Sequence, residues 1–224
     1  MSFTDRTAAG QALVAPVQAL GLQNPLVLAL PRGGIPVALE VARALRAPMD
    51  LLIVRKIGAP WNREMALAAV VEGDPPQTVT DAALAGASGA DADWIAGQAA
   101  REQGEIARRR RVYCQGRPPA DVRGRAVIVV DDGIATGTTV RAALQGLRRQ
   151  QPASLTLAVP VAPPDTVRAL QPLVDHLVCL RQPEGFEAVG QFYRHFDQVE
   201  DPQVMALLDA ARREGLMPGS VSGR

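Results

Sequence analysis

Short runs of consecutive apolar residues, separated by longer stretches of mixed polarity, dominate the hydrophobic pattern of the chain. Runs without polar alternation are typical of strands that are covered on both faces, as in parallel sheets. Five strands are predicted in this way, at Leu26–Leu30, Leu51–Val54, Ala126–Val130, Leu155–Val159 and Leu177–Leu180.

Apolar residues at helical spacing follow two of these strands and return near the C-terminus. The three stripes are Ile35–Leu45, Val140–Leu147 and Val204–Ala211. Asp201 is the expected N-cap of the last helix, with Pro202 at its first position and Gly215 after its end. Strands that alternate with helices imply βαβ crossovers. The pattern therefore predicts an α/β fold, with a doubly wound, mainly parallel sheet and a C-terminal helix.

The segment 55–112 interrupts the alternation of strands and helices. Short strands are predicted at Met65–Val71 and Thr78–Thr80, around a turn, and a helix is predicted from about Asp91 to Arg111. We expect one domain over residues 1–224, in which this segment is an insertion and residues 218–224 form a frayed tail.

Composition narrows the possible partners and the compartment. The chain has 24 basic and 23 acidic residues, a near-balance that argues against a dedicated nucleic-acid binder. The four arginines Arg108–Arg111 are therefore expected to be solvated or to contact a second subunit. Cys114 and Cys179 lack metal-site spacing and are expected to be reduced thiols. With no signal-peptide pattern and no apolar run of membrane length, we expect a cytoplasmic protein without a membrane partner.

The most specific signal in the chain is Val127–Thr139, VIVVDDGIATGTT. A buried strand ends in two carboxylates, Asp131 and Asp132, and a loop of small and hydroxyl residues then leads into a helix. Open α/β sheets bind ligands at such strand ends. The loop can surround a phosphate with backbone N–H groups, and the helix N-terminus adds partial positive charge. Carboxylates suit neutral hydroxyls better than a phosphate, so the segment predicts a site for ribose 5-phosphate.

Two other phosphate-binding motifs are excluded by what the chain lacks. The loop Gly133–Thr139 has no lysine after its second glycine, which a Walker A loop requires. No G-x-G-x-x-G follows a predicted strand, so a dinucleotide site is not expected. A surface loop with a capping threonine is the remaining structural interpretation.

Two further strand ends carry cations. Leu26–Gly34, LVLALPRGG, places Arg32 beside a glycine-rich backbone, where its guanidinium could clamp a diphosphate. Taken alone, this segment fits a turn with a solvated arginine equally well. The next strand ends in Arg55 and Lys56, which would stabilise departing negative charge. Ordinary strand-end charge is the competing interpretation of that pair.

The segment VIVVDDGIATGTT resembles the signature of the type I phosphoribosyltransferases that binds 5-phosphoribosyl-1-diphosphate (PRPP). The resemblance implies that Asp131 and Asp132 hold the ribose hydroxyls. The chain departs from the family at Gly133, where a bulkier aliphatic residue is usual. The residues implied to hold the 5′-phosphate are Ala135, Thr136, Gly137, Thr138 and Thr139. Those implied to hold the diphosphate are Arg32, Gly33, Gly34, Arg55 and Lys56, with a non-proline cis peptide in the loop of Arg32.

The family resemblance also covers the insertion and the last core strand. The stretch IGAPWNREMALAAVVEG is most similar to a bacterial group of phosphoribosyltransferases without an assigned substrate. In the family this region is a hood over the active site, so residues 55–112 are expected to be an enlarged, flexible hood. The segment after the last core strand often helps to hold the nucleobase. Phe186, Phe192 and Tyr193 are therefore candidates for stacking on a base, with core packing as the alternative.

The resemblance implies Mg²⁺-dependent transfer of the 5-phosphoribosyl group from PRPP to a nitrogen acceptor, a nucleobase, as in nucleotide metabolism. Asp131, Asp132, Arg32 and Lys56 are the expected catalytic residues, acting by positioning and electrostatics. Mg²⁺ is expected to be held mainly by PRPP rather than by protein ligands, and a homodimer is expected. A non-catalytic PRPP sensor on the same fold is the main alternative, and a ribose-phosphate hydrolase or phosphorylase is a third.

Overall fold

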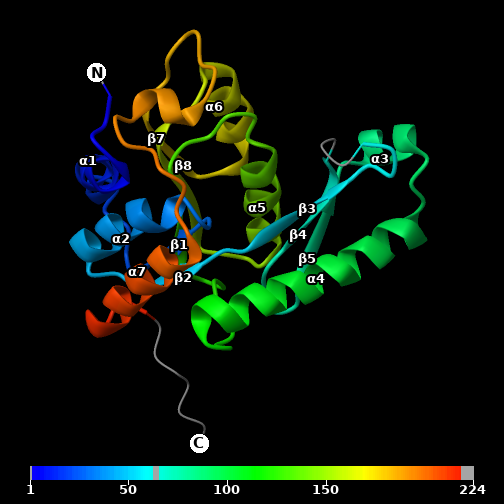
Figure 1. The fold of residues 1–224 in the computed structure, drawn as a ribbon, viewed down its shortest axis with the longest axis horizontal. Helices are drawn as coiled ribbons and strands as arrows, with labels where there is room; N and C mark the ends of the chain where they lie inside the picture. The colour runs from blue at the N-terminus through cyan, green and yellow to red at the C-terminus, as the bar shows by residue number, and fades with distance from the viewer. Residues whose placement is uncertain (1, 63–65, 218–224) are drawn as a thin grey trace, which may run out of the picture.

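The computed structural model describes residues 2–62 and 66–217, which form a parallel sheet with its helices and a smaller antiparallel sheet (Figure 1). The main sheet has the order β2-β1-β6-β7-β8, and every neighbouring pair is parallel. Its strands are β1 (Pro25–Ala29), β2 (Met49–Leu51), β6 (Ala126–Val130), β7 (Ser154–Val161) and β8 (His176–Arg181). The predicted α/β fold with a doubly wound parallel sheet is confirmed.

Helices on both faces explain why the strands are continuously apolar. Alternate side chains of a strand point to opposite faces. Ile128 and Val130 pack with α1, α2 and α7, whereas Val127 and Val129 pack with α5 and α6. These helices are α1 (Arg6–Gln18), α2 (Gly34–Leu45), α5 (Thr138–Arg149), α6 (Pro164–Leu170) and α7 (Asp201–Arg213), with short 3₁₀ turns at Gln171–Leu173 and Val189–Phe192.

The insertion forms a second layered unit that extends from the main sheet (Figure 1). Its antiparallel sheet has the order β3-β4-β5 and lies between α4 and α5, because Ala68 and Val70 of β4 face α4 while Ala69 and Val71 face α5. The apolar side of α4 thus packs on the predicted hairpin. The elements are β3 (Val54–Gly58), β4 (Ala66–Val71), β5 (Gln77–Thr80), α3 (Ala82–Ser88) and α4 (Ala92–Cys114).

The predicted strand Leu51–Val54 is wrong as one element. Leu51 ends β2 in the parallel sheet, and Val54 begins β3 in the antiparallel sheet. Leu52 and Ile53 connect the two sheets and are both buried. The apolar run therefore marks a buried crossing between sheets rather than one continuous strand.

Two helix ends also differ from expectation. Glu200, not Asp201, is the N-cap of α7, and its N–H donates to the Gln203 side chain at 3.0 Å. The Asp201 carboxylate instead accepts a 2.7 Å hydrogen bond from the Tyr113 hydroxyl. Helix α4 continues past the predicted end to Cys114, which places the arginine run inside it.

Helices α1, α3 and α6 were not predicted. Met65, the first residue of a predicted strand, and the predicted frayed tail 218–224 lie outside the described residues. No helix in the described ranges has the length and apolar character needed to cross a membrane.

Candidate active site

The candidate site lies where the strand order reverses, between β1 and β6. Their carboxyl ends are adjacent because the two strands pair directly, from Pro25 with Ala126 to Ala29 with Val130. Such a reversal is where doubly wound sheets bind ligands. The two loops that sequence analysis singled out, one after each strand, therefore meet at one edge of the sheet.

The glycines of the loop after β1 allow this meeting. A Cβ at Gly33 would lie 2.0 Å from Asp132 Oδ2, and a Cβ at Gly34 would lie 2.7 Å from the carbonyl oxygen of Val130. Any larger residue would displace the carboxylate or the strand end. The peptide bond between Pro31 and Arg32 is cis, as the family resemblance implied.

The loop after β6 presents hydroxyls and backbone at the start of α5. Gly137 is the N-cap of this helix and has a φ of +75°, a conformation that favours glycine. Thr136, Thr138 and Thr139 are exposed, and the Thr136 and Thr138 hydroxyl oxygens lie 3.4 Å apart. The carbonyl of Ala135 accepts a 2.7 Å hydrogen bond from the Thr166 hydroxyl. The first N–H groups of α5 are thus available for an anion beside these hydroxyls.

The chain departs from the family pattern at Gly133, and the local structure explains why glycine stands there. Its φ is +157°, and a Cβ there would lie 2.5 Å from a methyl carbon of Val189. A bulkier residue would therefore collide with the segment that follows β8. The absence of a side chain lets that segment cover the loop closely.

The two carboxyl groups after β6 are half-buried and differ in environment. Burial, followed by the negative charge of Asp132, raises the pKa of Asp131 well above its ordinary value. The Asp132 N–H donates to Asp131 Oδ1 at 2.9 Å. The Asp132 carboxylate forms an ion pair with Arg6 at 2.7 Å. The Tyr193 hydroxyl donates to the Asp132 carbonyl oxygen at 2.5 Å.

The predicted diphosphate-binding cations have different surroundings. The Arg32 guanidinium lies 3.4 Å from the carboxylates of both Glu200 and Asp201, at the start of α7. Arg55 forms a 2.7 Å ion pair with Glu102 of α4. Lys56 is exposed and follows Arg55 in β3, so the two side chains project from opposite faces of that strand.

The predicted base-stacking residues form part of an aromatic group after β8. The rings of Phe186 and Phe192 are stacked with centroids 5.3 Å apart, and both are partly exposed. Tyr193 is buried, and its ring lies 5.6 Å from that of Phe3 and 4.9 Å from that of Phe196. Tyr193 therefore packs in a small core with Phe3, while Phe186 and Phe192 remain accessible.

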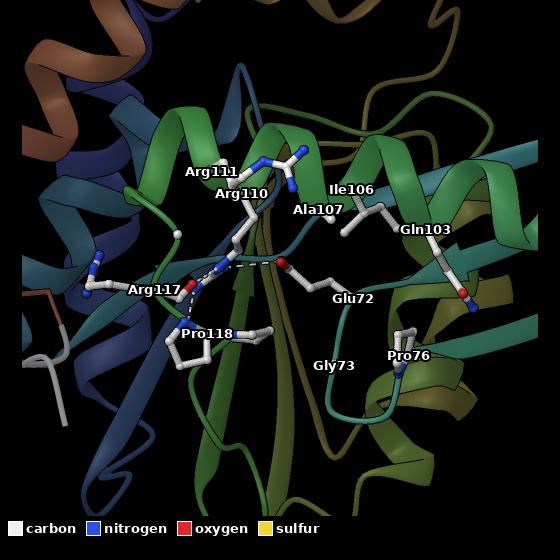
Figure 2. Close-up of a pocket in the computed structure, with 12 residues that line it drawn as sticks. Glu72, Gly73, Pro76, Gln103, Ile106, Ala107, Arg110, Arg111, Arg117 and Pro118 are labelled. Atoms are coloured by element: carbon white, nitrogen blue, oxygen red, sulfur yellow. Dashed lines mark hydrogen bonds and ion pairs between the residues drawn. The ribbon is translucent and has the colours of Figure 1, made fainter. Parts of the chain in front are cut away.

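A pocket of about 290 Å³ lies apart from these residues, between α4, the turn Gly73–Pro76 and the loop 116–119 (Figure 2). Arg110 and Glu72 line it, and neither is exposed. The Arg110 guanidinium donates to two carboxylates and three carbonyl oxygens, so each of its five N–H groups has an acceptor. These acceptors belong to Asp50, Glu72, Leu51, Arg117 and Pro118.

The expectation that Arg108–Arg111 are solvated or contact a second subunit is wrong for Arg110, which is only 5% exposed. Burial raises the pKa of Glu72 to about 7, although the positive charge of Arg110 opposes the shift. The Arg110 guanidinium bonds to Asp50 of β2 and to Glu72 of the insertion, so this cluster fixes the insertion on the main sheet. Its polar groups already bond to one another.

Sequence reasoning did not identify Arg6 as part of the site. Arg6 is the first residue of α1, a helix that the hydrophobic pattern did not predict. Among the described residues, His, Cys, Asp and Glu side chains form no group of three or more that could hold a metal ion.

Comparisons with known proteins match the chain to one protein family. A family model described as a phosphoribosyl transferase domain matches residues 8–194. Two curated proteins of Mycobacterium tuberculosis, from strains CDC 1551 and H37Rv, are provisionally named phosphoribosyl transferase. Each is 40% identical over 219 residues, or 98% of this chain, which spans about half (49%) of their length. The crystal structure of TT1426 from Thermus thermophilus is 42% identical, with a TM-score of 0.82, and the match covers 93% of this chain and 98% of that one.

Proposed function

This chain belongs to the phosphoribosyl transferase family, and we propose that it transfers the 5-phosphoribosyl group of PRPP to a nucleobase nitrogen with release of diphosphate. The observation that carries this proposal is the contact between the two loops at the β1/β6 edge. Gly33 lies directly against the Asp132 carboxylate there, so a ribose held by Asp131 and Asp132 would have its C1 substituent beside Arg32.

The 5′-phosphate is assigned to Ala135, Thr136, Gly137, Thr138 and Thr139. This assignment is supported by the exposed hydroxyls and by the helix N-terminus that begins at Gly137. Thr138 and Thr139 are the first two residues of α5, so their N–H groups have no intrahelical partner. A phosphate at this position would accept from backbone and side chain together.

The diphosphate is assigned to Arg32, Gly33 and Gly34, with help from the insertion. Arg32 is held by carboxylates at the start of α7, at distances of 3.4 Å that leave it able to shift toward a more highly charged ligand. Lys56 is proposed for a direct contact because its residue is exposed, whereas Arg55 forms an ion pair with Glu102 of α4. Arg55 would then act by ordering the insertion.

The reaction breaks the bond between C1 of the ribose and the diphosphate oxygen and forms a bond from the acceptor nitrogen to C1. The electron pair leaves with diphosphate, and the acceptor nitrogen loses its proton. Asp131 and Asp132 would stabilise positive charge on the ribose, while Arg32 and Lys56 would stabilise the leaving group. Mg²⁺ would enter with PRPP, held mainly by its oxygens, and supply further charge neutralisation.

The accessible Phe186 and Phe192 pair is proposed to stack on the acceptor base. Tyr193 is assigned a supporting role, since its ring is buried against Phe3. We place the protein in the cytoplasm, where the free thiols of Cys114 and Cys179 would stay reduced. A homodimer remains part of the proposal, and analytical ultracentrifugation tests it directly.

Calorimetric titration with PRPP and Mg²⁺ tests the site. The double variant Asp131→Asn, Asp132→Asn should lose PRPP binding by at least about tenfold, because neutral amides cannot replace two charge-assisted acceptors. Asp209→Asn supplies a control carboxylate on α7, away from both loops. Wild-type affinity in the double variant would contradict the site assignment.

Turnover separates an enzyme from a PRPP sensor. A screen of nucleobases with PRPP and Mg²⁺, scored by diphosphate release, should identify an acceptor. Arg32→Ala and Lys56→Ala should then reduce kcat more than PRPP affinity, because they act on charge that develops in the transition state. Equal losses would indicate simple binding. Diphosphate release without an added nucleobase would favour hydrolysis. The absence of diphosphate release with every nucleobase would favour the sensor.

A further inference from the structure

One side chain of α1, Arg6, reaches the candidate active site. Its Nε donates to Asp132 Oδ2 at 2.7 Å, and its Nη1 donates to the carbonyl oxygen of Asp197 at 2.7 Å. Its guanidinium carbon lies 3.9 Å from the ring centroid of Phe196. The side chains of Arg6 and Asp132 are 12% and 13% exposed, so solvent screens the ion pair only weakly. Contacts with Asp132, Asp197 and Phe196 therefore hold the Arg6 side chain in place.

Close contact between α1 and α2 fixes where Arg6 lies. A Cβ at Gly10 would be 2.7 Å from the carbonyl oxygen of Val37, so the two helices approach more closely than a larger residue would allow. Asp5 begins α1 by accepting a 2.8 Å hydrogen bond from the Ala8 N–H. The guanidinium is thus presented by a docked helix and not by a loose terminus.

The charged and titratable groups around Asp132 come from several elements. Arg6 approaches from α1, Asp131 precedes Asp132 at the end of β6, and Tyr193 follows β8. Arg181 of β8 lies within electrostatic reach of Tyr193. Two adjacent carboxyl groups repel each other when both are charged. Arg6 contacts this pair directly, through one oxygen of Asp132.

We propose that Arg6 is a positioning residue for ribose binding, which holds the Asp132 carboxylate in a single orientation for the substrate hydroxyl. This role rests on the proposed function, in which Asp131 and Asp132 bind the ribose. Because Arg6 contacts Oδ2, the hydroxyl is assigned to Oδ1. Fixing the carboxylate before the substrate arrives avoids the cost of ordering it during binding.

Calorimetry with PRPP and Mg²⁺ on three variants tests this role. Arg6→Met keeps much of the volume but has neither charge nor N–H, so PRPP should bind about tenfold more weakly or worse, as for loss of a hydrogen bond to a charged group. Arg6→Lys keeps the charge without the planar donor fork and should recover part of the affinity. Gln11→Ala, on the same helix, removes only an exposed hydrogen bond to Glu40 and should bind PRPP within about threefold of the wild type.

The same titrations from about pH 5 to about pH 8 give a readout that a structural role would not change. Burial raises the pKa of Asp131 and the positive charge of Arg6 opposes that rise, so Arg6→Met should move the acid limb of PRPP affinity to higher pH, and Arg6→Lys should move it back. Wild-type affinity and an unmoved acid limb in Arg6→Met would overturn the role of Arg6. Failure of the wild type to bind PRPP, or wild-type affinity in Asp131→Asn, Asp132→Asn, would instead overturn the proposed function.

Discussion

Replacing Glu72 with glutamine should make the protein progressively more stable than the wild type as the pH rises. Glu72 and Asp50 share one buried guanidinium, that of Arg110, so one negative charge is in excess once both carboxyls are ionised. Burial accordingly raises the pKa of Glu72 from its ordinary 4.5 to about 7. The substitution removes this excess charge and keeps an oxygen that can accept from Ile53 and Arg110.

The sign and size of the effect follow from proton linkage. The folded state holds the Glu72 proton more tightly than the unfolded state, so its contribution to stability is complete below pH 4.5 and is lost as the pH rises through about 7. At about 1.4 kcal/mol per pH unit, the wild type should lose about 3 kcal/mol relative to Glu72→Gln across that window.

Urea unfolding at constant ionic strength, followed by circular dichroism at several pH values, measures this difference in the free energy of unfolding. Glu105→Gln is the control on the same helix as Arg110. Arg108 and Arg109 lower the pKa of Glu105 to about 2, so above pH 4.5 its replacement should give a small effect that does not change with pH. A free-energy difference between Glu72→Gln and wild type that stays flat with pH would refute the reasoning.

Two further predictions concern the insertion. A Cβ at Gly146 of α5 would lie 2.8 Å from Val71, so Gly146→Ala should destabilise the protein by about 1–3 kcal/mol. Gly104 of α4 faces open space, so Gly104→Ala should stabilise the protein by about 1 kcal/mol. Urea unfolding midpoints of the two variants that shift in the same direction would contradict this contrast. Trp61 is 64% exposed, and in a Trp94→Phe background PRPP with Mg²⁺ should change its fluorescence and slow local proteolysis. An unchanged signal at saturating PRPP would mean that the stretch around Trp61 does not close over the substrate.

The sequence was most informative where a strand ends. A parallel strand must be apolar on both faces, so the change to Asp131 after β6 and to Arg32 after β1 marks the carboxyl end of each strand. The glycines next to both positions are equally visible, because close backbone approach excludes side chains. These loops lie on neighbouring strands, which is why their residues meet.

Residues whose roles depend on distant partners were not predictable in the same way. The buried stripe of α1 contains Ala9 and Gly10, which carry little hydrophobic signal, so neither the helix nor Arg6 at its start was expected. Arg110 did leave a trace, since it stands four residues after Ile106 and four before Cys114, at the spacing of a buried helix face. Because Arg110 is charged and stands among three solvated arginines, the sequence did not show that it is buried.

The contacts of Arg110 have a mechanical consequence. The guanidinium bonds both to Leu51, where the chain leaves the main sheet, and to Pro118, on its way back to β6. Both attachments of the insertion therefore converge on one point, which can serve as a pivot. From Arg110 to Ala92, α4 extends about 27 Å, so a rotation of about 10° at the pivot would move the far end by about 5 Å. Hydrogen bonds at the base would stretch little, while the other end, where the Trp61 indole N–H donates to the carbonyl oxygen of Ser88, would move the most.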